Sequence, residues 1–288
     1  MLIKENREPG YKNAGIKKYI VLEVANTRFA IISNYSPFMR WLMENYANFI
    51  SLNEPHLSLS VGFTKLPLGS NSGPFLSITR NGSQYEHGEL KMDVTCSYPT
   101  NFFGYMLQNC LRCTLTVKQP PDLLLHSSGI VHNEVAYLFT GMSGSGKSTI
   151  CRLLAEEPDF TVLHDEAVAI TQTEKSVHAW STPFRGEIPI KKNSSAPLRV
   201  IFFLRHDQTN HAIRLSAKKS LGLLYPNLIP PLVAKDDDLK VEPAESLKQL
   251  LKLAERIPCY ELHFKPEYSV WEYISYLLKE ESTMLRKG

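Results

Sequence analysis

A glycine-rich segment carries the clearest chemical signal in the chain. Residues 141–149 read GMSGSGKST and match the pattern G-x-x-x-x-G-K-[ST] in full. Its glycines let a backbone curl around a phosphate with the N–H groups pointing inward, beside the positive end of a helix dipole. Lys147 is placed to contact the β- and γ-phosphates, and the Ser148 hydroxyl to bind Mg²⁺. The predicted nucleotide-contacting residues are Gly141, Ser143, Gly144, Ser145, Gly146, Lys147, Ser148 and Thr149.

Two adjacent carboxylates follow the next apolar run along the chain. Asp165 lies 17 residues after Ser148, so the strand that carries it should neighbour the helix that leaves the glycine-rich segment. Side chains at the carboxyl ends of strands in an α/β sheet point into the ligand crevice. We therefore expect Asp165 to bind Mg²⁺ with Ser148 and to accept a proton from an attacking hydroxyl. Strand alternation sends His164 and Glu166 to the opposite face, unless a bulge re-aims Glu166.

The first third of the chain predicts an antiparallel or mixed sheet with one inserted helix. Two strands are expected within 19–33 around a turn at Asn26-Thr27, because β-branched and aromatic residues alternate there with polar ones. Ser36-Pro37 opens a helix whose apolar stripe continues to Ile50. Further strands are predicted at 56–64, at 75–80 and after the Asn81-Gly82 turn, and a helical pattern at 102–117.

The pattern changes beyond Lys118-Gln119-Pro120-Pro121, which is the best candidate domain boundary. Apolar runs at 123–125 and 135–139 are typical of parallel strands buried on both faces. Other strands are predicted at 160–163, 198–204, 212–216 and 259–264, and helices at 148–157, 243–256 and 270–281. This alternation predicts an α/β fold, with a nucleotide-binding domain at 121–288 and a smaller N-terminal α+β domain at 1–120 that recognises a partner or substrate.

Composition excludes several classes of protein. The 288 residues are 43% hydrophobic and 21% charged, enough for a packed core, and no apolar run approaches the ~20 residues of a membrane helix. A net charge of +3 without runs of like charge gives no sign of nucleic-acid binding. The charged first ten residues do not predict a secretory signal, and five cysteines, an odd number, suit reduced thiols. We expect a cytoplasmic protein without a membrane partner, and a homo-oligomer is compatible with the sequence.

Residue types that bind metals show no ligand spacing outside the glycine-rich segment and its carboxylates. Cys110 and Cys113 form a C-x-x-C pair without a second pair, which is a weak indication of zinc. The scattered histidines are expected to be core or surface residues. They are His56, His87, His132, His178, His206, His211 and His263.

Five segments together resemble the HPr kinase/phosphorylase-like proteins, whose P-loop domain is similar to that of ATP-dependent phosphoenolpyruvate carboxykinase. The segments are LLLHSSGIVHNEVAYLFTGMSGSGKST, VLHDEAVAI, STPFRGE, APLRVIFFL and IPCYELHF, and the resemblance covers 105–275. It is closest to the divergent branch often encoded beside peptide-modification genes. The resemblance implies a P-loop domain of this type, ATP and Mg²⁺ as cofactors, and phosphoryl transfer as the activity.

The resemblance also implies roles for individual residues. His126 occupies the place of a family histidine before the P-loop, and the family's paired aspartates match Asp165 and Glu166, the first as proton acceptor in phosphoryl transfer and its reverse. In place of the signature E-[IV]-R-G-[LIVM]-G the chain has TPFRGE, which supplies Arg185 and Glu187 in a different order. The first domain has no clear match to that of HPr kinase, so the bacterial phosphocarrier protein is not supported as a substrate. The candidate catalytic residues are Asp165, His126, Glu166 and Arg185.

Three functions fit these observations. The first is an ATP-dependent kinase that transfers the γ-phosphoryl group to a hydroxyl of a protein, peptide or small molecule. The second is a nucleotide-binding recognition or maturation module without transfer, and the third, a carboxykinase-like metabolic enzyme, is disfavoured by the short chain. Transporter ATPases and adenylylsulfate kinase have similar loops, but an LSGGQ signature and a D-G-D-type turn are absent from this chain. The sequence leaves the acceptor open, and also the choice among ATP, GTP and pyrophosphate.

Overall fold

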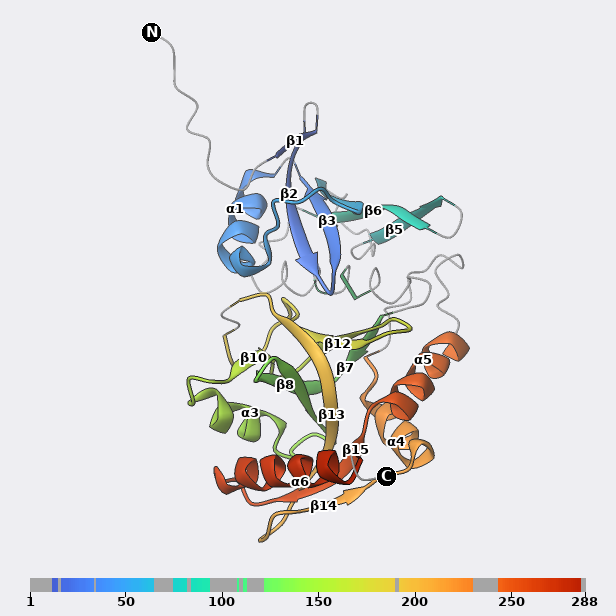
Figure 1. Ribbon diagram of the computed structural model, residues 1–288. Helices are drawn as coiled ribbons and strands as arrows, with labels where there is room; N and C mark the ends of the chain where they lie inside the picture. Colours follow the sequence, from blue (N-terminus) through green and yellow to red (C-terminus); the bar gives the residue numbers. More distant parts are fainter. Residues whose placement is uncertain are drawn as a thin grey trace. The chain divides into compact units, whose positions relative to one another are not determined.

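The described part of the chain forms two compact units, one from residues before Asp122 and one from Asp122 onward. A computed structural model describes residues 12–14, 17–33, 35–64, 75–81, 84–93, 108, 111–112, 122–189, 192–229 and 243–285 (Figure 1). Most of the predicted helix at 102–117, the candidate boundary at 118–121, and both Cys110 and Cys113 lie outside these residues.

The first unit contains a six-stranded sheet in the order β1-β2-β3-β4-β6-β5. Its strands are β1 (Lys12–Ala14), β2 (Lys17–Val24), β3 (Thr27–Ile32), β4 (Leu57–Thr64), β5 (Phe75–Asn81) and β6 (Gln84–Asp93). The predicted hairpin is confirmed, but its turn falls one residue earlier, where Ala25 and Asn26 adopt φ of 48° and 60°. The predicted helix is α1 (Ser36–Asn45), which buries Phe38, Met39 and Leu42; a short 3-10 turn, η1 (Ala47–Phe49), follows it.

The second unit is a mixed sheet with helices. Its strands are β7 (Leu123–Leu125), β8 (Ser127–His132), β9 (Val135–Thr140), β10 (Thr161–His164), β11 (Val168–Gln172), β12 (Val177–Trp180), β13 (Ser195–His206), β14 (His211–Arg214) and β15 (Cys259–Phe264). Its helices are α3 (Lys147–Ala155), α4 (Ala217–Leu224), η2 (Tyr225–Asn227), α5 (Pro243–Arg256) and α6 (Ser269–Leu285). Among the helices that the structure describes, none combines the length and the apolar character needed to cross a membrane.

The twelve-residue strand β13 joins the parts of this sheet. Its first residues pair antiparallel with β12, whereas the rest pair in parallel with β9 on one side and β15 on the other. The carboxyl ends of these three parallel strands therefore meet at one edge, where ligands bind in α/β sheets. In Figure 1, β13 is the long strand that runs through this unit.

One pairing differs from the sequence expectation. Strand β7 was expected to be parallel, yet it pairs antiparallel with β11. Strand β10 pairs antiparallel with β8, and its Val162 packs against the cluster that holds Ile150 and Leu154 of α3, so the strand neighbours this helix as expected. Short apolar runs show that a strand is buried but do not specify its direction, because direction depends on partners far along the chain.

Alternating side chains give the sheet two apolar faces. Leu138 and Ile201 belong to a cluster that includes the buried leucines of α4 and α5. Phe139 and Phe202, their neighbours in sequence, stack at 5.7 Å between ring centroids and pack with buried residues of α3 and α6. The sheet is therefore covered on both faces, with α3 held firmly beside the strand that precedes it.

This packing predicts a large cost for removing a stacked ring. We expect Phe139→Ala to lower the free energy of unfolding by about 3–5 kcal/mol, because the side chain is fully buried and leaves a cavity. Tyr276→Ala, at a residue that is 63% exposed, should change the same quantity by no more than about 0.5 kcal/mol. Urea denaturation of the full chain measures both, and equal effects would contradict the two-layer packing.

Candidate functional site

The glycine loop, residues 141–146, connects β9 to α3 as the sequence predicts. Gly141, Gly144 and Gly146 have φ of 143°, 77° and 97°, which L side chains rarely adopt. A Cβ on Gly146 would lie 2.6 Å from the Phe264 ring, so space as well as backbone conformation requires glycine there. No side chain caps the start of α3 and no acidic residue occupies its first turn. The helix thus begins with N–H donors and a positive dipole end that favour an anion.

The Lys147 side chain folds back into this loop. Its Nζ donates hydrogen bonds to the carbonyl oxygens of Gly141 at 2.9 Å and Met142 at 3.1 Å, and the residue is only 6% exposed. Burial lowers the pKa of Lys147, while the nearby Glu166 carboxylate acts in the opposite direction. The Ser128 hydroxyl donates to the Lys147 carbonyl oxygen at 3.0 Å and ties the helix start to β8. The ammonium is therefore a positive group held within the loop.

The rest of the loop differs in exposure and contacts. Ser143, Gly144 and Thr149 are exposed, Ser148 is half-buried, and the buried Ser145 hydroxyl oxygen lacks a hydrogen-bond partner in the described structure. His206, at the end of β13, donates from Nε2 to the Gly144 carbonyl oxygen at 3.1 Å and stacks on Phe264. Sequence reasoning missed His206, because its contact with the loop depends on the pairing of β13 with β9.

Asp165 and His164 are both fully buried, and His164 has one defined tautomer. Its Nδ1 accepts hydrogen bonds from the backbone N–H groups of Glu166 and Ala167, so its Nε2 carries the proton and donates to the Phe184 carbonyl oxygen at 2.9 Å. Burial lowers the pKa of His164 more strongly than its hydrogen bond and the adjacent carboxylates raise it. His164 is thus a neutral residue that holds the turn after β10.

The Asp165 carboxylate lies under the segment 184–188. Its Oδ2 accepts hydrogen bonds from the backbone N–H groups of Glu187 at 2.9 Å and Ile188 at 3.2 Å. Its Oδ1 has no hydrogen-bond partner, and a Cβ on Gly186 would lie 2.0 Å from it. Glu187 also pairs with Arg152 of α3 at 2.7 Å. Asp165 therefore fixes this covering segment and is closed to solvent.

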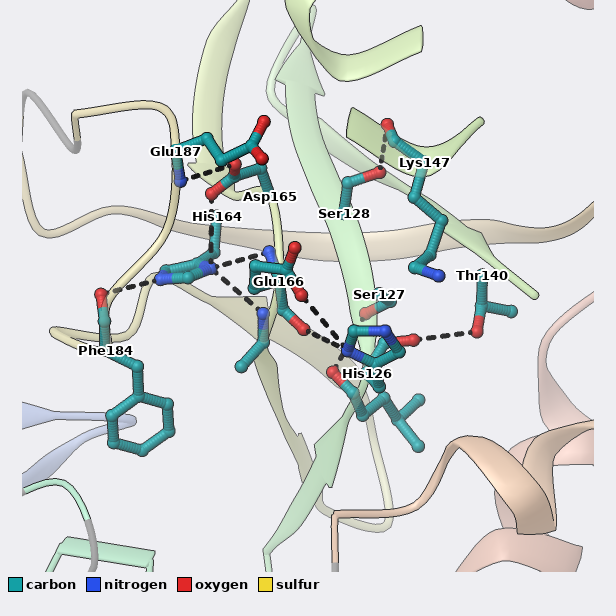
Figure 2. A network of polar contacts seen from close by, with 12 residues as sticks. His126, Ser127, Ser128, Thr140, Lys147, His164, Asp165, Glu166, Phe184 and Glu187 are labelled. Atoms are coloured by element: carbon teal, nitrogen blue, oxygen red, sulfur yellow. Dashed lines mark hydrogen bonds and ion pairs between the residues drawn. The ribbon is translucent and has the colours of Figure 1, made fainter. Parts of the chain in front are cut away.

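Glu166 occupies the position that alternation assigned to Asp165. A register shift between Val162 and His164 interrupts the pairing of β10 with β8, and Glu166 turns toward His126 and Lys147 (Figure 2). His126 Nδ1 donates to the Glu166 carbonyl oxygen at 3.0 Å and lies 3.4 Å from its Oε2. Both side chains are 39% exposed. This register shift is the bulge that the sequence analysis named as the exception to strand alternation for Glu166.

The predicted site residues thus divide into two groups. One group gathers at the glycine loop and consists of the loop with Lys147, His126 and Glu166; the other, Asp165 and Arg185, belongs to the segment 184–188 and the carboxylate beneath it. In the first group, the Thr140 hydroxyl donates a 3.0 Å hydrogen bond to the His126 carbonyl oxygen. Arg185 lies exposed in the segment that covers Asp165. The sequence indicated the loop, His126, Lys147 and both carboxylates but not Thr140, and it did not separate the exposed carboxylate from the buried one.

The donor set fits a magnesium triphosphate. An uncapped helix start and the Lys147 ammonium are anion donors, and the Ser148 hydroxyl and Glu166 carboxylate are the oxygen ligands that Mg²⁺ prefers. Asp165 Oδ1, which accepts no hydrogen bond and lies 3.7 Å from His164 Nδ1, is a further oxygen suited to a cation, but the Gly186 backbone covers it.

Comparison with known families places most of the second unit in a described family. The model of the family "SynChlorMet cassette protein ScmC" matches residues 101–279, more than half of the chain, and the chain therefore belongs to the ScmC family. Among solved structures it is similar to the Hpr(Ser) kinase/phosphatase from Coxiella burnetii, with 9% identity, a TM-score of 0.31, and coverage of 57% of this chain and 98% of that one. We infer nothing about activity from a likeness this distant, and the HPr kinase resemblance stays a prediction. A search of curated proteins found no match.

The buried neutral His164 predicts a pH-dependent contribution to stability. Its folded pKa lies below the ordinary value of 6.5, so near and below that pH the unfolded chain binds more protons than the folded one. The contribution is fully present above about pH 6.5 and is lost as the pH falls toward the folded pKa. We expect the difference in free energy of unfolding between wild type and His164→Asn, measured in urea, to shrink from pH 7.5 to pH 5.5. A difference that grows on acidification would contradict the neutral assignment.

Proposed function

We propose that the glycine loop binds Mg·ATP and that the protein transfers the γ-phosphoryl group to a hydroxyl of a peptide, protein or small molecule. The observation that supports this most directly is the complete loop, with three positive-φ glycines, an uncapped helix start and the buried Lys147. On binding, phosphate oxygens would replace the Gly141 and Met142 carbonyl oxygens as partners of Lys147. Such charge-assisted hydrogen bonds are stronger than those to neutral carbonyls.

The pair His126 and Glu166 is suited to take the proton in this reaction. As the acceptor oxygen forms its bond to the γ-phosphorus, the bond from phosphorus to the β-phosphate oxygen breaks, leaving ADP, and the hydroxyl proton must move to a base. Because His126 Nδ1 donates to the Glu166 carbonyl oxygen, Nε2 of the neutral ring holds the accepting lone pair. The Glu166 carboxylate, 3.4 Å from Nδ1, would stabilise the resulting imidazolium.

The other groups have electrostatic and positioning roles in this proposal. Lys147 would neutralise charge on the leaving diphosphate. Mg²⁺, held by Ser148 and Glu166, would supply further charge neutralisation at the phosphates. Asp165 would act by holding the backbone of the segment 184–188, in which Arg185 is exposed.

A second candidate is a nucleotide-binding recognition module without phosphoryl transfer. One observation favours this candidate. Asp165, which the sequence suggested as the base, has no exposed surface and is closed to an acceptor hydroxyl. Purified protein incubated with γ-labelled ATP and an extract of its host distinguishes the two functions. A labelled acceptor supports the kinase, whereas ATP binding without label transfer supports the module.

Lys147→Ala tests nucleotide binding. Loss of a charge-assisted phosphate contact should weaken Mg·ATP binding by at least about 1.5 kcal/mol, or roughly tenfold in Kd. Lys175→Ala, at an exposed position in a different loop, is the matched control and should leave the Kd unchanged. Isothermal titration calorimetry measures all three proteins. Equal affinity in wild type and Lys147→Ala would remove the proposed site.

Substitutions at the carboxylates and His126 test the proposed base. We expect His126→Ala and Glu166→Gln each to lower the initial rate of label transfer about 10²–10⁴-fold, while Mg·ATP still binds through the loop. Glu174→Gln, an exposed carboxylate, is the control and should transfer label at the wild-type rate.

Asp165→Asn separates this assignment from the sequence-based one. A severe rate loss in a folded Asp165→Asn protein, with Glu166→Gln still active, would move the base to Asp165. Wild-type rates in all three variants would contradict the kinase mechanism.

A further inference from the structure

A second cluster of chemically active side chains lies outside the glycine loop. Asp207, His211 and His263 each present a ligand atom, and these atoms all lie within 4.8 Å of one another. The antiparallel register of β14 and β15 places His211 directly opposite His263, and Asp207 follows β13, the parallel neighbour of β15. Fifty-two positions separate the two histidines in the sequence, so only strand pairing brings them together.

His263 is oriented by carboxylates on both of its ring nitrogens. Its Nε2 lies 3.0 Å from Glu261 Oε1, and its Nδ1 lies 3.1 Å from Asp207 Oδ2. Glu261 is itself held by Arg205, whose Nε is 3.5 Å from Oε2. A metal-binding histidine usually donates one ring N–H to a carboxylate and binds the metal through its other nitrogen. In His263, Glu261 would hold Nε2, and an ion between Nδ1 and Asp207 Oδ2 would replace their direct contact.

Asp207 is likewise held in place by hydrogen bonds. Its Oδ1 accepts a 2.6 Å hydrogen bond from the Gln208 backbone N–H, and its own N–H donates to the Phe264 carbonyl oxygen. Its other carboxylate oxygen, Oδ2, is directed at His263 Nδ1.

We propose that Asp207, His211 and His263 bind a divalent transition-metal ion of the Zn²⁺ class, with Glu261 setting the tautomer of His263. Two imidazoles and one carboxylate are typical ligands of Zn²⁺ and related ions and poor ligands of Mg²⁺ or Ca²⁺. With metal–ligand bonds of about 2.0–2.1 Å, the 3.1 Å between Nδ1 and Oδ2 corresponds to an angle of about 100° at the ion, close to that of common coordination geometries.

One ring must move for the third ligand to bind. The His211 and His263 rings stack at 4.2 Å between centroids and 16° between planes, so their lone pairs do not converge. His211 is exposed and its ring can turn out of the stack to direct a nitrogen at the ion. The partial exposure of His263, 22%, and of Asp207, 34%, leaves further coordination positions open to water.

The proposal does not depend on nucleotide binding, although the two sites share one edge of the sheet. Asp207 directly follows His206, which contacts the glycine loop at Gly144. Metal binding is therefore measured on the full chain without nucleotide.

Calorimetric titration of the metal-free full chain with Zn²⁺ tests the site. We expect one equivalent to bind to wild type, His211→Ala and His263→Ala to weaken binding at least about 100-fold, and Glu261→Gln to weaken it about 10–100-fold. His178→Ala, at a half-buried histidine on β12, is the matched control and should bind as wild type does. Circular dichroism checks that each variant is folded, and the exposure of His211 makes its substitution the least disruptive.

Co²⁺ spectroscopy identifies the ligands. Bound Co²⁺ should show visible d–d bands without a thiolate charge-transfer band, and Cys110→Ser/Cys113→Ser should leave these bands intact. Zn²⁺ binding that is lost in the cysteine variant and kept in His211→Ala would overturn the proposal. Failure of wild type to bind Zn²⁺ more tightly than Mg²⁺ would also overturn it.

Discussion

The parallel pairing of β9 with β13 is the constraint on which the rest of the second unit depends. Leu198 to Phe203 align with Ala136 to Thr140, so both strands end at one edge. The glycine loop leaves β9 at this edge, and His206 at the end of β13 reaches its Gly144 carbonyl oxygen. The same strand carries β15 on its other side, which brings His263 to Asp207. A shift in this register would move His206 away from the glycine loop. Because Asp207 follows β13, the same shift would also separate Asp207 from His211 and His263.

Two adjacent carboxylates show how environment divides the roles of similar groups. Asp165 has no exposed surface, and its Oδ2 accepts hydrogen bonds from the backbone of the segment 184–188. Glu166, in contrast, is 39% exposed beside His126. The electrostatic influence of Glu166 on the Lys147 ammonium links the carboxylate to the loop. Asp165 thus holds the neighbouring backbone in place, while Glu166 is accessible from solvent beside the Lys147 ammonium.

Local pattern predicted much of the fold, and long-range pairing explains the rest. The helix opened by Ser36-Pro37 and the strand–loop–helix around residues 141–149 follow from nearby residues alone and are confirmed. The antiparallel partner of β10 and the bulge that re-aims Glu166 depend on β8, more than thirty residues earlier in the chain. The cluster of His211 and His263 has no local spacing that could have indicated it, because strand register alone creates it. The sequence therefore predicted the glycine loop, but it did not predict how Asp165 and Glu166 are oriented or that His211 and His263 lie together.

Hydrogen exchange at the backbone of the glycine loop tests the proposed anion site most directly, because backbone amide groups as well as Lys147 are proposed to contact the phosphates. Exchange of the amides at 141–149 is compared with and without Mg·ATP, with the β12 amides as an internal reference. We expect slower exchange in the loop and the first turn of α3 when Mg·ATP is added, and no change in β12. Unchanged exchange across 141–149 at saturating Mg·ATP would contradict the proposed anion site.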